Sequence, residues 1–383
     1  MYFKYISSRK NEETSSESSS SDLLSIQRIN FFLWSKRDGE NLERLIRFLR
    51  LTLNRELNQA AYNWQTIKPK GAPEAFQIEL TNDCPMTCVM CPRTRSMTRA
   101  IGYMDATLFR HVVREVSQYS SKIFLHHFGD SLIHPQLGEL IEFARKHGMQ
   151  TYLSGNPNLL TNNRIHELVD YGLYELVLSL DGVSAATSEA IRGRAASNVE
   201  EAERKVRSFL EYRKARNMKT PYLILQFVRQ KMNQHETASW LAKWKTVKGI
   251  DVVKVKTFVS WDGHDDRIND LRIDSVPEPN VVCDKPWTSV TVLWDGRVVP
   301  CCFDYDGLYV LGNLSKQSIR ELWSSEAACR LRQAHRDQTL DDIKLCARCT
   351  DKEGYSVGKW YYPLNRFLSQ RMPLGDEDVI ALG

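Results

Sequence analysis

The sequence of 383 residues lacks three features that mark large classes of protein. No run of eighteen apolar residues occurs, so we expect no membrane span. The N-terminus has no hydrophobic region of the signal-peptide kind, which predicts a cytoplasmic protein. No block of five or more like charges occurs and the net charge is only +5, so nucleic-acid binding is not indicated. With 42% hydrophobic and 26% charged residues, the composition is that of an ordinary globular protein.

Cysteine is the residue type that carries the most information. Nine cysteines in a reducing compartment are better explained as metal ligands than as disulfides. Cys84, Cys88 and Cys91 follow an apolar run in the spacing C-x3-C-x2-C, and thiolates favour zinc or iron–sulfur centres. Three thiols are one short of the four that a closed site needs. Two interpretations stay open: a zinc knuckle with a fourth ligand from elsewhere, and an iron–sulfur cluster with one open iron.

A second set of cysteines predicts another metal site near the C-terminus. Its candidate ligands are Cys283, Cys301, Cys346 and Cys349. The first two flank an expected β-hairpin with the turn Asp295-Gly296, and the last two form a C-x2-C pair. Four thiols can close a zinc site or a [4Fe–4S] site, and the spacing does not separate the two. Cys302 could replace Cys301 as a ligand.

The remaining chain alternates strands and helices, which predicts parallel pairing and an α/β fold. We expect strands near 76–80, 122–127, 149–154, 174–180, 221–227 and 250–257, and helices near 105–119, 136–147, 161–171, 198–216 and 233–246. Leucines at helical spacing between residues 40 and 59 predict a helix that packs on the main domain, with a membrane-surface helix as the alternative. The expected parts are a disordered tail (1–22), an N-terminal helical segment (23–74), the α/β domain (75–260), a linker (261–282), the second metal domain (283–352) and a C-terminal segment (353–383).

At its first cysteine motif the sequence resembles the radical S-adenosylmethionine (SAM) superfamily, whose signature is this spacing after the first barrel strand. The resemblance implies a partial (β/α)6 TIM-like barrel and a [4Fe–4S] cluster on Cys84, Cys88 and Cys91. It also implies that SAM binds the fourth iron and is cleaved reductively to a 5′-deoxyadenosyl radical. The second cysteine set is similar to the SPASM and twitch extensions of this superfamily, which hold auxiliary clusters. Tyr355 and Lys359 stand where a full SPASM domain has further cysteines, so we expect one auxiliary cluster, two [4Fe–4S] clusters in all.

The same resemblance implies residues that bind SAM. They are Met90, Gly129, Asp130, Ser154, Asn156, Ser179 and Arg192. Met90 would lie against the adenine, and Gly129 would let the backbone approach the ligand. Asp130 would accept hydrogen bonds from the SAM ammonium, although it could instead cap the following helix. The three short polar side chains would reach the ribose, and Arg192 would pair with the SAM carboxylate.

The layout resembles that of the twitch-type dehydrogenases of aminocyclitol assembly, which implies oxidation of a sugar-like or cyclitol alcohol. Lys254, Lys256 or Arg229 would then assist deprotonation, although the two lysines could instead line a polar barrel mouth. A flavodoxin- or ferredoxin-type donor would supply the reducing electron. Two alternatives remain: a maturase of a ribosomally made peptide, and a non-catalytic zinc or iron–sulfur module.

Overall fold

The computed structural model describes residues 38–273, 282–349 and 378–381. The chain divides into two compact units, residues 1–50 and 51–383. Helix α2 (Asp38–Asn63) crosses this division, which confirms the predicted helix. In the described ranges, no helix is both long and apolar enough to cross a membrane. The predicted tail (1–22) lies outside the described residues, as do Trp360 to Pro363 in the C-terminal segment.

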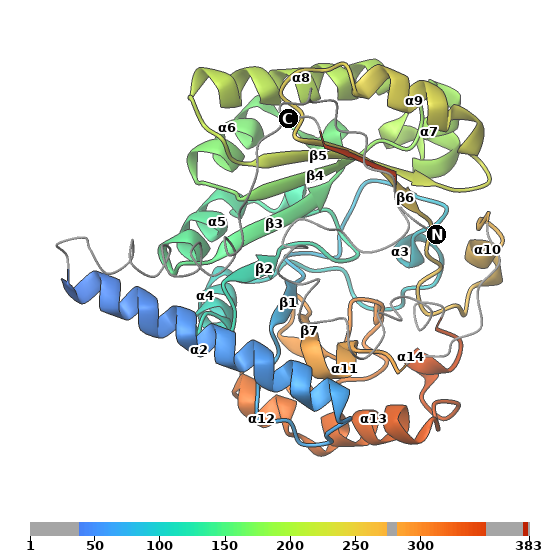
Figure 1. Ribbon diagram of the computed structural model, residues 1–383. Coiled ribbons are helices and arrows are strands. Elements are labelled where there is room, and N and C mark those ends of the chain that lie inside the picture. The colour runs from blue at the N-terminus through green and yellow to red at the C-terminus, as the bar shows by residue number, and fades with distance from the viewer. Residues whose placement is uncertain (1–37, 274–281, 350–377, 382–383) are drawn as a thin grey trace, which may run out of the picture. The chain divides into compact units, whose positions relative to one another are not determined.

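Six parallel strands form the centre of the second unit (Figure 1). They are β1 (Ala75–Ile78), β2 (Lys122–Phe124), β3 (Gln150–Gly155), β4 (Glu175–Ser179), β5 (Tyr222–Arg229) and β6 (Val252–Thr257). The strands lie in sequence order, each paired in parallel with the next. This confirms the predicted α/β fold with a partial TIM-like barrel.

Helices alternate with these strands, and most were expected. They are α4 (Ala106–Val116), α5 (Leu137–Lys146), α6 (Asn162–Asp170), α7 (Ala185–Arg192), α8 (Val199–Ala215) and α9 (Thr237–Trp244). Short turns of 3-10 helix also occur: η1 (Ser131–Ile133), η2 (Pro157–Leu159), η3 (Arg194–Ala196) and η4 (Gln234–Glu236). Helix α7 was not among the expected helices, because it is short and its sequence reads as a loop after β4.

Alternate residues of each strand face two different environments. Ile123, Leu153, Leu176, Leu223 and Val253 are fully buried, as expected where helices cover the sheet. Their neighbours in the strands are only partly buried and face the other way, because side chains alternate across a strand. This second set is the inner face of the barrel, and it carries most of the polar candidate residues.

The C-terminal elements extend the same sheet from its β1 edge. Strand β7 (Ser289–Val292) pairs in parallel with β1, and β8 (Arg297–Val299) and β9 (Gly312–Asn313) continue antiparallel. The predicted hairpin is present, with Gly296 at φ +84° in its turn. Helices α11 (Lys285–Thr288), α12 (Ile319–Trp323), α13 (Glu326–Asp337) and α14 (Lys344–Ala347) surround it (Figure 1). On the other edge, β10 (Asp378–Ala381) pairs antiparallel with β6.

The predicted linker is a packed segment over residues 261–273. It contains α10 (Asp266–Asn269), in which Ile268 is buried. Trp261 packs edge-on against Phe128 and Phe303, and its Nε1 donates to the Met90 carbonyl at 2.8 Å. This segment therefore covers the first cysteine loop, which the proline-rich composition of the region did not indicate.

Candidate functional site

The first three cysteines lie in the loop that joins β1 to α3 (Pro92–Arg95). Two backbone hydrogen bonds join the loop to the end of α7. The Thr87 N–H donates to the Arg192 carbonyl at 3.0 Å, and the Val89 N–H donates to the Ile191 carbonyl at 2.8 Å. Gly193 follows with φ +85°, and a Cβ there would lie 1.9 Å from Thr87 Oγ1. Glycine is therefore needed at this position for the cysteine loop to sit where it does.

The thiols of this loop lie in an apolar setting that disfavours their ionisation. Cys88 is buried, and burial raises its pKa despite the nearby guanidinium of Arg192. Burial likewise raises the pKa of Cys84 to about 12 and that of Cys91 to about 11. Thiols in such a setting bind as thiolates when a metal centre supplies the compensating charge.

Arg192 is bound within the protein rather than free to meet a ligand. Its Nε donates to Asp181 Oδ2 at 2.7 Å, its Nη2 forms an ion pair with the same oxygen at 2.5 Å, and Asp181 is fully buried. Its Nη1 donates to the Cys88 sulfur at 3.8 Å. Although burial lowers it, Asp181 and the thiols hold the pKa of Arg192 above its usual range. The side chain predicted to pair with the SAM carboxylate thus lies beside a candidate cluster ligand, with most of its donors used.

Gly129 and Asp130 follow β2 and have partners inside the protein. A Cβ on Gly129 would lie 2.1 Å from the Thr81 carbonyl oxygen, so the close approach is to the end of β1. Asp130 Oδ1 accepts from Leu132 N–H at 3.0 Å, which caps η1, and Oδ2 accepts from Asn156 N–H at 2.8 Å. Burial raises the pKa of Asp130 to about 6. Asp130 therefore caps η1, as the alternative interpretation predicted, and its second carboxylate oxygen holds the backbone of Asn156.

The remaining predicted SAM contacts gather at the carboxyl ends of the strands, which is the edge that carries the active site in TIM-like barrels. Ser154 lies near the end of β3, and Ser179 ends β4, where it accepts a hydrogen bond from Gln226 Nε2 at 3.4 Å. Met90 is buried in the apolar cluster around the first cysteine loop. These side chains and the cysteine loop therefore occupy one region of the barrel.

The predicted basic residues lie on the two last barrel strands. Lys254 and Lys256 share the partly buried inner face of β6, as their spacing predicted, and Arg229 ends β5. Lys254 acts electrostatically on Glu175, and Lys256 on His126. The two lysines therefore sit at different depths within the barrel, and Lys256 is the one closer to the open strand ends.

The two adjacent histidines after β2 have separate roles, because they point to opposite sides. Within the described residues, His126 Nδ1 is buried without a hydrogen-bond partner. Burial lowers the pKa of His126 to about 4, so the ring is neutral at pH 7. Its place beside Lys256 makes it a further candidate, and a histidine at a strand end was the signal that could have found it.

His127 belongs to a buried charged group centred on Glu79, which follows β1. Glu79 Oε1 and Oε2 accept from Arg99 Nη2 and Nη1 at 2.6 and 2.8 Å, and Oε1 accepts from His127 Nδ1 at 3.0 Å. His127 Nε2 donates to the Cys302 carbonyl at 3.0 Å, and Arg99 Nε to that of Tyr305 at 2.6 Å. We call these three side chains the Glu79 hub. It joins the barrel, the segment after the first cysteine loop and the C-terminal elements.

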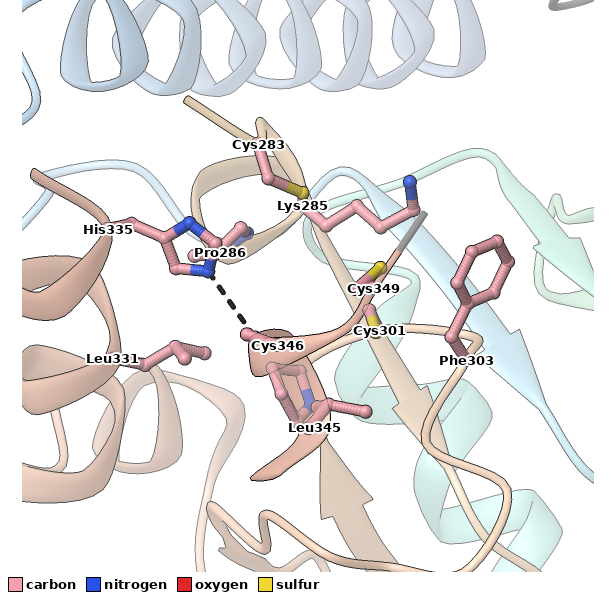
Figure 2. Close-up of a pocket in the computed structure, with 11 residues that line it drawn as sticks. Cys283, Lys285, Pro286, Cys301, Phe303, Leu331, His335, Leu345, Cys346 and Cys349 are labelled. Carbon is pink, nitrogen blue, oxygen red and sulfur yellow. Dashed lines mark hydrogen bonds between the residues drawn. The ribbon is translucent and has the colours of Figure 1, made fainter. Parts of the chain in front are cut away.

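The second cysteine set surrounds one small cavity (Figure 2). The cavity has a volume of about 30 Å³, and its lining is almost entirely apolar. Its lining residues include Cys283, Cys301, Cys346 and Cys349, together with Lys285 and His335. Cys302 does not line it, and Cys329 Sγ points instead to the Ser324 carbonyl. The structure thus brings together the four cysteines that spacing had selected.

The donor set of this cavity fits an iron–sulfur cluster. Burial raises the pKa of Cys283 to about 12 and raises that of Cys301 well above its usual value, so free thiols here would be protonated. Within the described residues, no three His, Cys, Asp or Glu side chains converge closely enough to hold a single metal ion. The four cysteine side chains line one cavity, and soft thiolate donors of this kind are those that iron–sulfur clusters use.

The sequence profiles of two families match the two parts of the chain. The Radical SAM superfamily matches residues 78–224, and SPASM, described as an iron–sulfur cluster-binding domain, matches residues 283–350. The chain belongs to the radical SAM superfamily. Both domains imply iron–sulfur clusters and SAM as cofactors, and the protein is a radical SAM enzyme.

Similar proteins differ in what they act on. The tungsten-containing aldehyde ferredoxin oxidoreductase cofactor-modifying protein of Pyrococcus furiosus is 24% identical over 289 residues, which cover 65% of this chain and 80% of that protein. The S-adenosyl-L-methionine-dependent 2-deoxy-scyllo-inosamine dehydrogenase of Niallia circulans is 21% identical over 301 residues, covering 76% and 97%. The structure of anSMEcpe with bound AdoMet and a peptide aligns with a TM-score of 0.53 at 15% identity, covering 75% and 92%. At this identity the structural likeness shows the fold.

Proposed function

We propose that this radical SAM enzyme oxidises a secondary alcohol of a sugar-like or cyclitol substrate to a ketone. Cys84, Cys88 and Cys91 would hold one [4Fe–4S] cluster with an iron open to SAM, and Cys283, Cys301, Cys346 and Cys349 would hold a second. When bound, these groups supply the radical that removes hydrogen from carbon and the acceptor for the electron that alcohol oxidation releases. A flavodoxin- or ferredoxin-type protein is the proposed source of the reducing electron.

The observation that carries this proposal is the small cavity that all four cysteines of the second set line. Four thiols face it, so a cluster held there has a protein ligand for every iron and no position for substrate. A cluster of that kind serves to accept or pass electrons, which a net oxidation requires. The dehydrogenase of Niallia circulans supports the choice of an alcohol, because its likeness to this chain spans 97% of its length.

The inner face of the barrel supplies groups for the substrate. The hydroxyl proton must leave as the ketone forms, and Lys256 acts electrostatically on His126. His126 is neutral at pH 7 and has an acceptor nitrogen without a partner in the described chain. Lys254, deeper and beside Glu175, and Arg229 are the other proposed groups for orienting substrate. The apolar cover of Trp261 and Phe128 limits water around the first cysteine loop.

The test begins with metal content. Protein reconstituted without oxygen should hold about eight irons per chain, as two [4Fe–4S] clusters require. It should form 5′-deoxyadenosine from SAM when reduced by dithionite. The matched control replaces Cys84, Cys88 and Cys91 with alanine, which should remove about four irons and all cleavage. Zinc in place of iron, or cleavage that survives in the control, would refute the proposal.

Substrate class is tested with labelled alcohols. Cyclitols and sugars deuterated at the carbinol carbon should transfer deuterium into 5′-deoxyadenosine and yield a ketone. Transfer from a peptide, with none from any alcohol, would overturn the alcohol assignment in favour of a peptide-modifying enzyme. The Lys256→Met variant should keep SAM cleavage and lose ketone formation, whereas Lys316→Met, on an exposed residue, should change neither.

A further inference from the structure

His335 contacts one of the four cysteines that surround the second cavity. Its Nε2 lies 3.5 Å from Cys346 Sγ, and Figure 2 shows the imidazole directed at that sulfur. Both residues are buried, with exposed fractions of 3% and 9%. Solvent therefore does not compete for this contact, and a hydrogen bond between the two side chains is stronger here than at the surface.

The imidazole is held in place by its neighbours. It projects from the last turn of α13, and the Trp287 ring lies edge-on to it at 6.3 Å. Leu331, one turn earlier on α13, lines the same cavity, so the ring stands against an apolar wall. A ring fixed in this way keeps its nitrogen near the sulfur, which a solvent-exposed histidine would not do.

The direction of the hydrogen bond follows from the chemistry of the ligand. A cysteine that binds iron is a thiolate, which has no proton to donate. The proton must therefore be on His335 Nε2, and the imidazole donates to the sulfur. Lys285, a basic side chain elsewhere on the cavity wall, lies 5.3 Å from the Phe303 ring centroid and acts electrostatically on Cys283 and Cys301. The two basic side chains thus act on different cysteines.

We propose that His335 is a positioning residue that raises the reduction potential of the auxiliary cluster by donating a hydrogen bond to the Cys346 thiolate. The inference rests on the proposed function for the presence of that cluster. Reduction adds one electron, and the added negative charge spreads onto the cysteine sulfurs. A donor aimed at one of them stabilises the reduced form more than the oxidised form, because hydrogen bonds to the sulfurs and burial set cluster potentials. No bond forms or breaks, and His335 keeps its proton.

The test measures the potential directly, without relying on turnover. The background is the full chain with Cys84, Cys88 and Cys91 changed to alanine, so that only the auxiliary cluster is present. A dithionite titration followed by electron paramagnetic resonance should give a lower midpoint for His335→Phe, by about a tenfold change in the reduction equilibrium, or about 59 mV for one electron. His335→Gln, which restores an N–H donor, should recover most of the difference. Leu331→Met is the matched control, because it alters the same wall without touching a donor.

Each outcome decides a separate question. An equal midpoint for His335→Phe and Leu331→Met refutes the inference and leaves the proposed function intact. A background protein that binds no iron refutes the auxiliary cluster itself. Should His335→Phe fail to hold iron, the test uses the background protein with His335 unchanged, measured in D2O. Its reduced cluster should show coupling to an exchangeable proton that His335→Gln alters and Leu331→Met does not, and the absence of that coupling overturns the inference.

Discussion

The Glu79 hub predicts a large loss of stability for the change Glu79→Gln. The Glu79 side chain is fully buried, and those of Arg99 and His127 are 3% and 1% exposed. Both nitrogens of His127 face oxygen atoms, one on Glu79 and one on Cys302. Removing the carboxylate charge would leave the buried Arg99 guanidinium without its counterion. Breaking a buried pair in this way costs about 3–5 kcal/mol.

The acidity of Glu79 gives a second estimate of the same quantity. Although burial raises it, hydrogen bonds from His127 and Arg99 lower its pKa from 4.5 to about 2. At 1.36 kcal/mol for each tenfold change in proton affinity, this corresponds to about 3 kcal/mol. Because the folded-state pKa lies below the unfolded value, that stabilisation is complete above pH 4.5 and is lost as the pH falls toward 2. The two estimates agree.

Urea unfolding of the reconstituted protein at pH 7 measures the loss. We expect the free energy of unfolding of Glu79→Gln to fall by about 3 kcal/mol, with a weaker dependence on pH between 4.5 and 2. The matched control is Glu142→Gln, which breaks a partly exposed pair with Lys146 and should cost about 0–0.5 kcal/mol. A loss below about 1 kcal/mol for Glu79→Gln, or one equal to the control, would refute the reasoning.

Two further substitutions test the cysteine sites. Gly193→Ala should lower the iron content of the first cluster and abolish SAM cleavage, because the added Cβ would clash with Thr87 Oγ1. Gly249→Ala, also at positive φ but with its nearest neighbouring atom 3.5 Å from the added Cβ, should keep the iron and the cleavage. Equal iron content in the two variants would contradict this reasoning. Cys301→Ser should remove about half of the iron and Cys302→Ser none, because Cys301 lines the cavity and Cys302 does not. The reverse result would make Cys302 the ligand.

The alternation of strands and helices was predictable because its signals are local, whereas the barrel itself was implied by the family resemblance. Runs such as Ile123-Phe124-Leu125 mark buried strands, and turns and helical periodicity separate them. The cysteine spacings were equally direct, since a loop of eight residues can bring three thiols to one place without help from the rest of the fold. Strand alternation alone predicted that Lys254 and Lys256 share one face of a strand, but not which way that face points.

What could not be predicted depends on contacts between distant segments. Nothing local indicates that β7 pairs with β1, since their residues lie more than two hundred positions apart, as in Phe76 opposite Val290. The predicted helix was expected to pack on the main domain through its leucines. Within residues 51–63, Asn54 and Asn58 make the contact instead, because their side-chain amides donate to the Ala72 carbonyl, while Leu53 is 61% exposed. Helical periodicity identifies a stripe of apolar residues, but it does not identify polar side chains that form hydrogen bonds with a buried turn.

The Glu79 hub explains why the two cysteine sites keep a fixed relation. Arg99 lies eight residues beyond Cys91, and His127 donates to the carbonyl next to Cys301, so one carboxylate ties a segment near each site to the end of β1. Since β7 also pairs with β1, the C-terminal elements are held both by backbone pairing and by buried charge. A rigid connection of this kind is what the proposed electron transfer, from a substrate in the barrel to the auxiliary cluster, would require. We therefore expect Glu79→Gln to slow the proposed oxidation of the substrate even when the urea concentration is too low to unfold the chain.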